Sequence, residues 1–186
     1  QYLKKMGITS LNENSDNNLS LALGGISDGI TPLQMAGAYA TIANDGEYIE
    51  PTFYTEVTRK NGKRLIKNKQ EKHQVFSEEV AYVLKELLTQ PVLGSKGTAT
   101  YCKINGVDVA AKTGTTDENY DKWFCGFTPY YTATCWYGYD KNETVNFNKK
   151  NPAGLIWANV MTRIHSGLAS AIFERPSKVE VATICN

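Results

Sequence analysis

Histidine and cysteine are scarce in this chain, which limits the metal chemistry available to it. The 186 residues include only two histidines, His73 and His165, and four cysteines, at positions 102, 125, 135 and 185. No two cysteines have the C-x-x-C spacing of a zinc site or a thioredoxin-like motif. We therefore expect neither a metal ion nor another cofactor, and we interpret the cysteines as buried structural thiols.

Long apolar runs and an excess of one charge are also missing. No run approaches a membrane span in length, and the first residues, Gln1 to Met6, have no signal-peptide pattern. Because the chain also begins without methionine, we expect it to be part of a longer one. Its 20 basic and 19 acidic residues give a net charge of +1 and are spread along the sequence. This balance predicts no nucleic-acid partner and no charge-driven contact with a membrane.

Apolar residues make up 41% of the chain, enough to bury the core of one domain, and three helices are predicted. The first begins at the capping box Thr31-Pro32-Leu33-Gln34, has proline at its first position, and should stop at Gly46. Ser77 caps the second, which Pro91 should end, and Asn151-Pro152 begins the third. The stripes expected to face the core are residues 80, 83, 84, 87 and 88 in the second helix, and Trp157, Met161, Ile164 and Leu168 in the third.

Strand signals lie between these helices. Residues 53–59 and 63–67 flank Asn61-Gly62, which predicts a polar surface hairpin with a type I′ turn. Residues 107–112 look extended, and two strands between 123 and 139 should be joined by a turn around Thr128-Pro129-Tyr130. Helices before and after a run of neighbouring strands favour an α+β fold, an antiparallel β-sheet flanked by helices.

The stretch that carries chemistry is Lys112-Thr113-Gly114-Thr115-Thr116, at the end of a predicted strand. Gly114 lets a substrate backbone come close, while Lys112 can hold its ammonium beside the groove. The hydroxyls of Thr113 and Thr115 alternate with Gly114, so they point to the same side, where they could bind a carboxylate. An edge strand would also offer free N–H groups to an extended peptide or a developing oxyanion. The bland alternative is an exposed Lys-Thr-Gly turn.

A longer pattern around this stretch resembles that of class A, bifunctional penicillin-binding proteins. The segment Lys112 to Thr116 is followed by Asp121-Lys122-Trp123-Phe124-Cys125-Gly126-Phe127-Thr128-Pro129, similar to the family's K-T-G-T-T and D-x-W-F-x-G-[YF]-T-P motifs. Upstream, residues 21–25 and 31–40 resemble its A-L-G-G and S-P-L-E-M-A-x-A-Y-A segments. Ala111 stands where many members have glycine. The motifs occur in the family's order and cover most of the chain.

The resemblance implies a penicillin-binding, serine β-lactamase-like fold and a D,D-transpeptidase that cross-links peptidoglycan stem peptides through a serine acyl-enzyme, which β-lactams inactivate. By the family pattern, Lys112 and Thr115 are catalytic, while Thr113, Gly114, Thr115 and Thr116 bind substrate. Lys112 would help the S-x-N serine move protons, and the Thr115 N–H would join the oxyanion hole. The family's location is the extracytoplasmic face of the cell envelope, so we expect a membrane anchor outside this chain.

The family's nucleophile has no counterpart in these residues. No serine has lysine three residues later, so the S-x-x-K motif is absent. Ser15-Asp16-Asn17 matches S-x-N in letters, but the family's S-x-N precedes the segment that Leu3 to Ile8 resembles, so we interpret 15–17 as a turn. We therefore expect residues 1–186 to form the C-terminal portion of a transpeptidase domain, partnered by the upstream part that carries both motifs and inactive alone.

Three questions stay open at this level. A sensor domain could bind β-lactams or cell-wall peptides without turnover, and a stand-alone β-lactamase is a further alternative, although the absent S-x-x-K disfavours it. Cys125 and Cys135 are placed symmetrically about Tyr130, so a hairpin could pair them as a disulfide. A shift of one residue in register would send their side chains to opposite faces, and two free thiols are the favoured interpretation.

Overall fold

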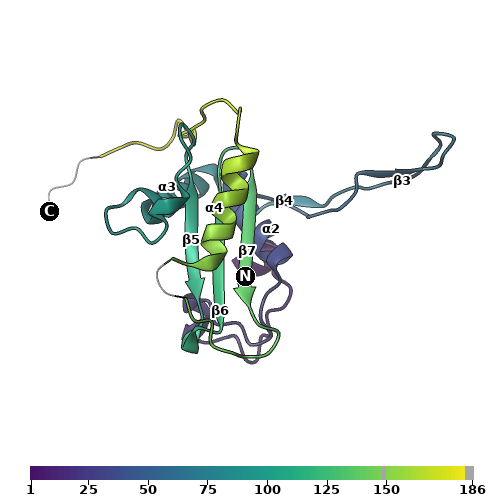
Figure 1. Ribbon diagram of the computed structural model, residues 1–186. Coiled ribbons are helices and arrows are strands. Elements are labelled where there is room, and N and C mark those ends of the chain that lie inside the picture. Colours follow the sequence, from purple (N-terminus) through teal and green to yellow (C-terminus); the bar gives the residue numbers. More distant parts are fainter. Residues whose placement is uncertain (148–149, 183–186) are drawn as a thin grey trace.

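The computed structural model describes residues 1–147 and 150–182. A three-stranded antiparallel sheet lies at its centre, made of β5 (Ala110–Thr115), β6 (Asp121–Phe127) and β7 (Thr132–Gly138) in that order. Helix α4 (Pro152–Ile164) covers one face and α2 (Pro32–Ala43) the other, while α3 (Glu78–Leu93) packs against β5 (Figure 1). This arrangement confirms the predicted α+β fold with an antiparallel sheet flanked by helices.

Each face of the sheet has its own apolar core. Alternate residues of a strand point to opposite faces, so Phe124 packs with Trp157 of α4, whereas Phe127 packs with Phe173 on the α2 side. Small residues let α4 come close: a Cβ on Gly126 would lie 3.0 Å from the Trp157 ring. The sheet is therefore fixed between two dissimilar cores, and a slip of register by one residue would exchange their contents.

The capping box of the first predicted helix is present. The Thr31 hydroxyl accepts a hydrogen bond from the Gln34 N–H at 3.2 Å, and the Gln34 side chain accepts one from the Thr31 N–H at 3.1 Å. Helix α2 ends at Ala43, after which Asp45 and Gly46 both have positive φ, at 52° and 84°. A side chain on Gly46 would also meet the Phe76 carbonyl oxygen at 2.1 Å, so glycine is required at this turn.

The predicted hairpin is present as β2 (Glu56–Thr58) paired with β3 (Arg64–Lys67), but the turn type was wrong. A type I′ turn needs positive φ at both central residues. Here Gly62 has φ 79° and Asn61 does not have positive φ. The Gly62 N–H bonds the Arg59 carbonyl and the Arg59 N–H bonds the Lys63 carbonyl, which makes a three-residue loop with glycine at its left-handed position.

Short elements complete the fold. The ribbon of β2 and β3 projects from the body, near a second strand pair, β1 (Glu47–Ile49) with β4 (Lys72–Gln74) (Figure 1). The other short elements are the helix α1 (Tyr2–Lys5) and the 3₁₀ turns η1 (Leu19–Leu23), η2 (Thr100–Cys102) and η3 (Asp117–Asn119). Within the described ranges, no helix has both the length and the apolar character needed to span a bilayer.

Helix α3 departs from two predictions. It continues through Pro91 to Leu93, since one proline removes a single backbone hydrogen bond, while buried Val92 anchors the last turn. The predicted core stripe is only partly correct. Val80, Val83 and Leu87 are 48%, 49% and 62% exposed, and only Leu84 and Leu88 pack against the core. The buried line is instead Ala81, Lys85, Thr89 and Val92.

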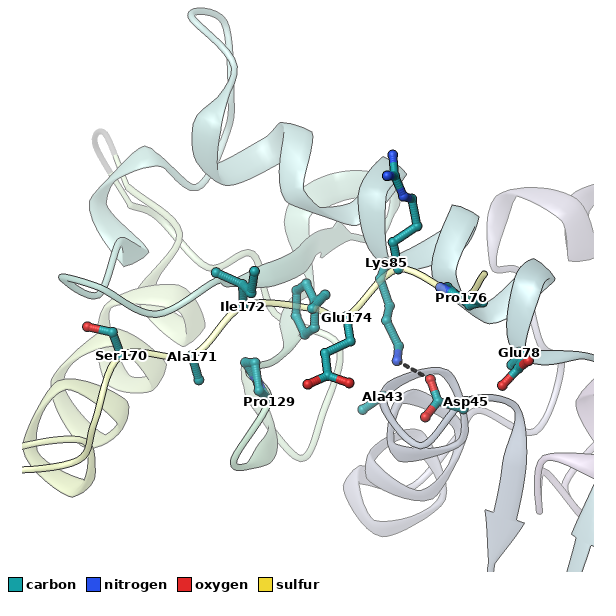
Figure 2. Close-up of a pocket in the computed structure, with 12 residues that line it drawn as sticks. Ala43, Asp45, Glu78, Lys85, Pro129, Ser170, Ala171, Ile172, Glu174 and Pro176 are labelled. Atoms are coloured by element: carbon teal, nitrogen blue, oxygen red, sulfur yellow. Dashed lines mark hydrogen bonds and ion pairs between the residues drawn. The ribbon is translucent and has the colours of Figure 1, made fainter. Parts of the chain in front are cut away.

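A buried lysine explains why this helix face is turned inward. The side chain of Lys85 is only 6% exposed, and its Nζ donates to Asp45 Oδ1 at 2.6 Å. Its Nζ also lies 5.8 Å from the centroid of the Phe173 ring. Figure 2 shows the lysine reaching from α3 to Asp45, beside a cavity of about 590 Å³ that Glu78 and Glu174 also line. Periodicity of apolar residues cannot reveal a core position filled by a paired charge.

The third predicted helix is α4, and its core-facing stripe is shorter than expected. Trp157 and Met161 are buried, but Ile164 is 46% exposed and Leu168 lies beyond the helix end at 38% exposure. The chain turns away there, with Gly167 at φ 86°. Beyond it, residues 171–173 pair with the segment before β5 through Ala171 and Val107.

The three cysteines in the described residues are free thiols, in agreement with the favoured interpretation. In the β6–β7 register Cys135 is opposite Phe124 and Cys125 is opposite Thr134, so the two side chains point to opposite faces. Cys102, Cys125 and Cys135 are free, and Cys185 lies outside the described residues. The hypothesis of a bridge between Cys125 and Cys135 is therefore wrong, because the observed register differs by one residue from the pairing that the bridge requires.

We expect Asp45→Asn to lower the free energy of unfolding by about 1–3 kcal/mol, because it leaves the Lys85 ammonium buried without a counter-charge. Asparagine tolerates the positive φ at this position, so backbone strain does not contribute. Lys85→Met, which keeps the length and removes the charge, should cost less. Urea unfolding of both variants tests the pair, and an equal or larger loss for Lys85→Met would contradict this account.

Candidate active site

The candidate site lies along β5, the edge strand that contains Lys112 to Thr115. The β5–β6 register places Lys112 opposite Cys125 and Gly114 opposite Trp123, so these four residues share the face that packs on α2. Thr113 and Thr115 point to the other face, as their alternation predicted. All of the strand from Lys112 to Thr115 still lines one cavity of about 390 Å³.

Residues from distant parts of the chain form the other walls of this cavity, which we call the β5 groove. Its upstream wall consists of Ser20, Leu23, Gly24, Gly25 and Ile30, followed by Met35 and Tyr39 of α2. The predicted motif segments at 21–25 and 31–40 are thus brought beside the Lys-Thr-Gly strand. Trp123 is half-buried in the groove wall, whereas Phe124 is fully buried in the core.

The ammonium of Lys112 is accessible in the β5 groove. The residue is exposed, and its Nζ donates a hydrogen bond to the neighbouring Thr113 carbonyl oxygen at 2.9 Å. Beneath it, Cys125 is 3% exposed, and burial raises the pKa of its thiol to about 12. A thiol with so high a pKa stays protonated near neutral pH. Cys125 therefore lines the groove as an unreactive thiol and does not act as a nucleophile.

Thr98 joins the site from the glycine-rich connector between α3 and β5. Its hydroxyl lies 3.3 Å from the hydroxyl of Thr113, within hydrogen-bond range. The connector itself is closely packed, because a Cβ on Gly97 would meet the Pro91 carbonyl oxygen at 2.3 Å. Thr98 was not among the site residues predicted from the sequence. Thr98 is 15 residues from Thr113 in sequence, so no local pattern indicates this contact.

Asp121 clamps the end of the strand. One carboxylate oxygen accepts a hydrogen bond from the Thr116 hydroxyl at 3.0 Å, and the other accepts one from the Trp136 indole N–H at 2.7 Å. The Asp121 N–H in turn donates to the Thr116 hydroxyl oxygen at 2.8 Å. Thr116 therefore lines the β5 groove but has its hydroxyl engaged by the β5–β6 turn. Asp121 belongs to a motif identified in the sequence, but its hydrogen bonds to Thr116 and Trp136 were not predicted.

The Ser15-Asp16-Asn17 loop forms a turn that hydrogen bonds from neighbouring segments stabilise. The Asp16 carboxylate accepts hydrogen bonds from the Ser27 hydroxyl, the Ser27 N–H and the Asn12 N–H. The bond from the Ser27 hydroxyl, followed by those from the two amides, holds the pKa of this carboxyl below its ordinary value. Asp16 and Asn17 line a separate surface cavity with Gln1 and Lys4. These contacts agree with the turn interpretation.

A second, apolar cavity of about 630 Å³ adjoins the β5 groove, and the two share Gly24, Ile30, Met35, Tyr39 and Lys112. Its walls come from α1, the segment 21–30, α2 and α3, and they include Leu84, Leu87 and Leu88. Burial raises the pKa of the Tyr39 phenol above its ordinary value. Leu19 and Leu23 of η1, beside these cavities in sequence, are 89% and 91% exposed. Apolar surface therefore continues from the groove to α3.

The chain is similar in sequence to known penicillin-binding proteins. A family model described as "Penicillin binding protein transpeptidase domain" matches residues 3–162. Penicillin-binding protein 1A of Clostridium botulinum is 35% identical over 184 residues, which cover 99% of this chain and 22% of that protein. Penicillin-binding protein 1F of Bacillus subtilis is 35% identical over 187 residues, covering 96% of this chain and 25% of that protein. The chain thus spans about a quarter or less of these relatives.

The solved structure of PonA1 from Mycobacterium tuberculosis in complex with penicillin V is similar, with a TM-score of 0.77 at 26% identity. The match covers 95% of this chain and 52% of that one.

We expect Asp121→Ala to reduce the free energy of unfolding by about 1–3 kcal/mol, because the Trp136 indole N–H and the Thr116 hydroxyl both lose their acceptor. Asp140→Ala, an exposed carboxylate just past β7, is the matched control and should change stability little. Urea unfolding measures both. Equal effects of the two substitutions would show that Asp121 does not clamp the turn.

Proposed function

The chain belongs to the penicillin-binding protein transpeptidase family, in its class A branch, and from this premise we propose that it supplies the Lys-Thr-Gly strand and substrate groove of a D,D-transpeptidase. The enzyme would cross-link peptidoglycan stem peptides through a serine acyl-enzyme and would be acylated by β-lactams. One observation carries the proposal: Lys112, Thr113 and Thr115 line a single groove along the open edge of a strand.

The groove provides complementary groups for a peptide or β-lactam that carries a carboxylate. The Lys112 ammonium supplies positive charge and would assist proton movement to and from the nucleophile. The hydroxyls of Thr113 and Thr115 would bind the carboxylate, with Thr98 holding the Thr113 hydroxyl in place. Gly114 keeps the strand free of a side chain where a substrate backbone must pass.

Backbone groups would complete the chemistry. The Thr115 N–H, on the edge strand, would donate to the oxyanion that develops when the serine attacks the substrate carbonyl. Thr116 would bind substrate from the end of the groove through the position that Asp121 gives it. In this role Asp121 is a positioning residue, because it acts through Thr116 and does not reach the reacting atoms.

The nucleophile would come from another segment of the same protein, carrying S-x-x-K and S-x-N. We propose that this segment sits in the apolar cavity beside Lys112, since its packing there would bring a serine to the β5 groove. Leu87 and the other apolar walls support this placement, because apolar surface on this scale is normally covered by a partner element. Residues 1–186 would then be the C-terminal portion of one transpeptidase domain.

The location follows from the same proposal. Cross-linking of stem peptides takes place where peptidoglycan is assembled, so the domain would face the outside of the cell and be anchored to the membrane by a segment outside these residues. The finding that PonA1 has been solved with penicillin V supports the proposed partnership with β-lactams.

In the full-length protein, we expect Lys112→Ala to slow acylation by a fluorescent penicillin by about a hundredfold or more, because the groove loses its positive charge. Thr115→Val should slow it less, through weaker carboxylate binding. Lys103→Ala, an exposed lysine outside the groove lining, is the control. Unchanged acylation kinetics for Lys112→Ala would remove the lysine from the mechanism, and acylation without any cross-linking of stem peptides would favour a sensor.

We also expect residues 1–186 alone to form no covalent adduct with a β-lactam, because none of their serines has the lysine partner that activates attack. Intact-mass measurement after incubation with penicillin tests this. A stoichiometric acyl adduct on any serine of the chain would overturn the proposal that the nucleophile lies in another segment.

A further inference from the structure

The near-neutral total charge conceals one strongly cationic segment. Residues 55–69, which we call the cationic arm, contain six basic residues and one acidic residue, whereas the rest of the chain carries 14 basic and 18 acidic residues. The six are Arg59, Lys60, Lys63, Arg64, Lys67 and Lys69. A cationic segment on a body with net charge −4 concentrates attraction for anions at one place.

The structure separates this charge from the body. Figure 1 shows the ribbon of β2 and β3 reaching away from the sheet and helices, and every residue of both strands is exposed. All six basic residues are exposed, and none forms an ion pair within residues 1–147 and 150–182. Internal neutralisation therefore does not account for them, and an external anion is the complementary partner.

The register distributes the cations over both faces of the ribbon. Arg64 is opposite Thr58 and Lys67 is opposite Glu56, with a register shift between these two pairs. Because Glu56 and Thr58 are two residues apart on β2 and share a face, Arg64 and Lys67 also lie on that face. Arg59 and Lys63, joined by a backbone hydrogen bond, are the next pair along and lie on the other face. Lys60 sits in the loop. A flat surface can contact only one of the two faces at a time, so this distribution favours a flexible chain that bends around the ribbon.

Side-chain chemistry narrows the class of polymer further. Arginine offers paired N–H donors that match phosphate oxygens, and lysine adds point charges, so the arm is suited to repeated phosphates. No aromatic side chain lies among the cations of the arm on which nucleic-acid bases could stack, and the exposed Phe53 and Tyr54 precede β2. We propose that the cationic arm binds a linear polymer of repeated phosphate groups without bases, through charge and not through base recognition. This interaction is independent of the transpeptidase proposal.

The test measures binding of end-labelled linear polyphosphate to the full-length protein by fluorescence anisotropy over a series of salt concentrations. We expect the combined substitution Arg59, Lys60, Lys63 and Arg64→Gln to weaken binding at low salt by at least about tenfold. The slope of log affinity against log salt should fall by about 3, as four phosphate contacts are lost. The matched control replaces Lys5, Lys103, Lys141 and Arg163 by Gln, which removes the same charge from the body.

The expected result is loss in the arm variant with retention in the control, while thermal unfolding shows that both proteins fold. Equal loss in the two variants would overturn the proposal, because only total charge would matter. Unchanged binding in the arm variant would overturn it as well. Binding to phosphatidylglycerol vesicles without binding to polyphosphate would indicate a membrane instead. Tighter binding to oligothymidylate or to polyglutamate would indicate a nucleic acid or an acidic protein, and either result would overturn the assignment.

Discussion

The pairing of β5 with β6 is the constraint on which the rest of the structure depends. It places Lys112 opposite Cys125 and sets Ala110 and Ala111 on opposite faces, each fully buried in a different core. Because the two cores hold different side chains, the register cannot slip without exchanging buried for exposed groups. The orientation of Lys112 toward the groove is therefore fixed by packing around Phe124 and Phe127, at positions that take no part in chemistry.

An open strand edge is normally a liability, because unpaired backbone groups invite unwanted pairing. In this fold the edge of β5 is limited by its surroundings. Helix α3 and the tight connector that carries Thr98 pack beside it, and the Asp121 clamp closes its far end. The accessible part is thus reduced to the length that lines the β5 groove. The same walls that protect the edge define where an extended substrate would lie.

The sequence predicted those features that depend on local signals. The Thr31 capping box, the strands on either side of Pro129 and the alternation of Thr113 with Thr115 all follow from rules that involve neighbouring residues. Features that depend on distant partners were missed. Lys85 fills a core position only because Asp45 reaches it from the turn after α2, and this changed part of the predicted stripe of α3. The contact of Thr98 with Thr113 and the role of Asp121 require the fold for the same reason.

The error on α3 bears on the proposed function. Leu87, which the periodicity assigned to the core, lines a cavity next to Lys112 and is 62% exposed. Periodicity reports that a helix face is built for burial, but it does not identify the element that buries it. If a segment with the nucleophilic serine packs there, the pattern is correct for the assembled domain, and the covering element is the missing partner. The exposure of Leu87 and the position of the proposed nucleophile outside residues 1–186 would then have one physical origin.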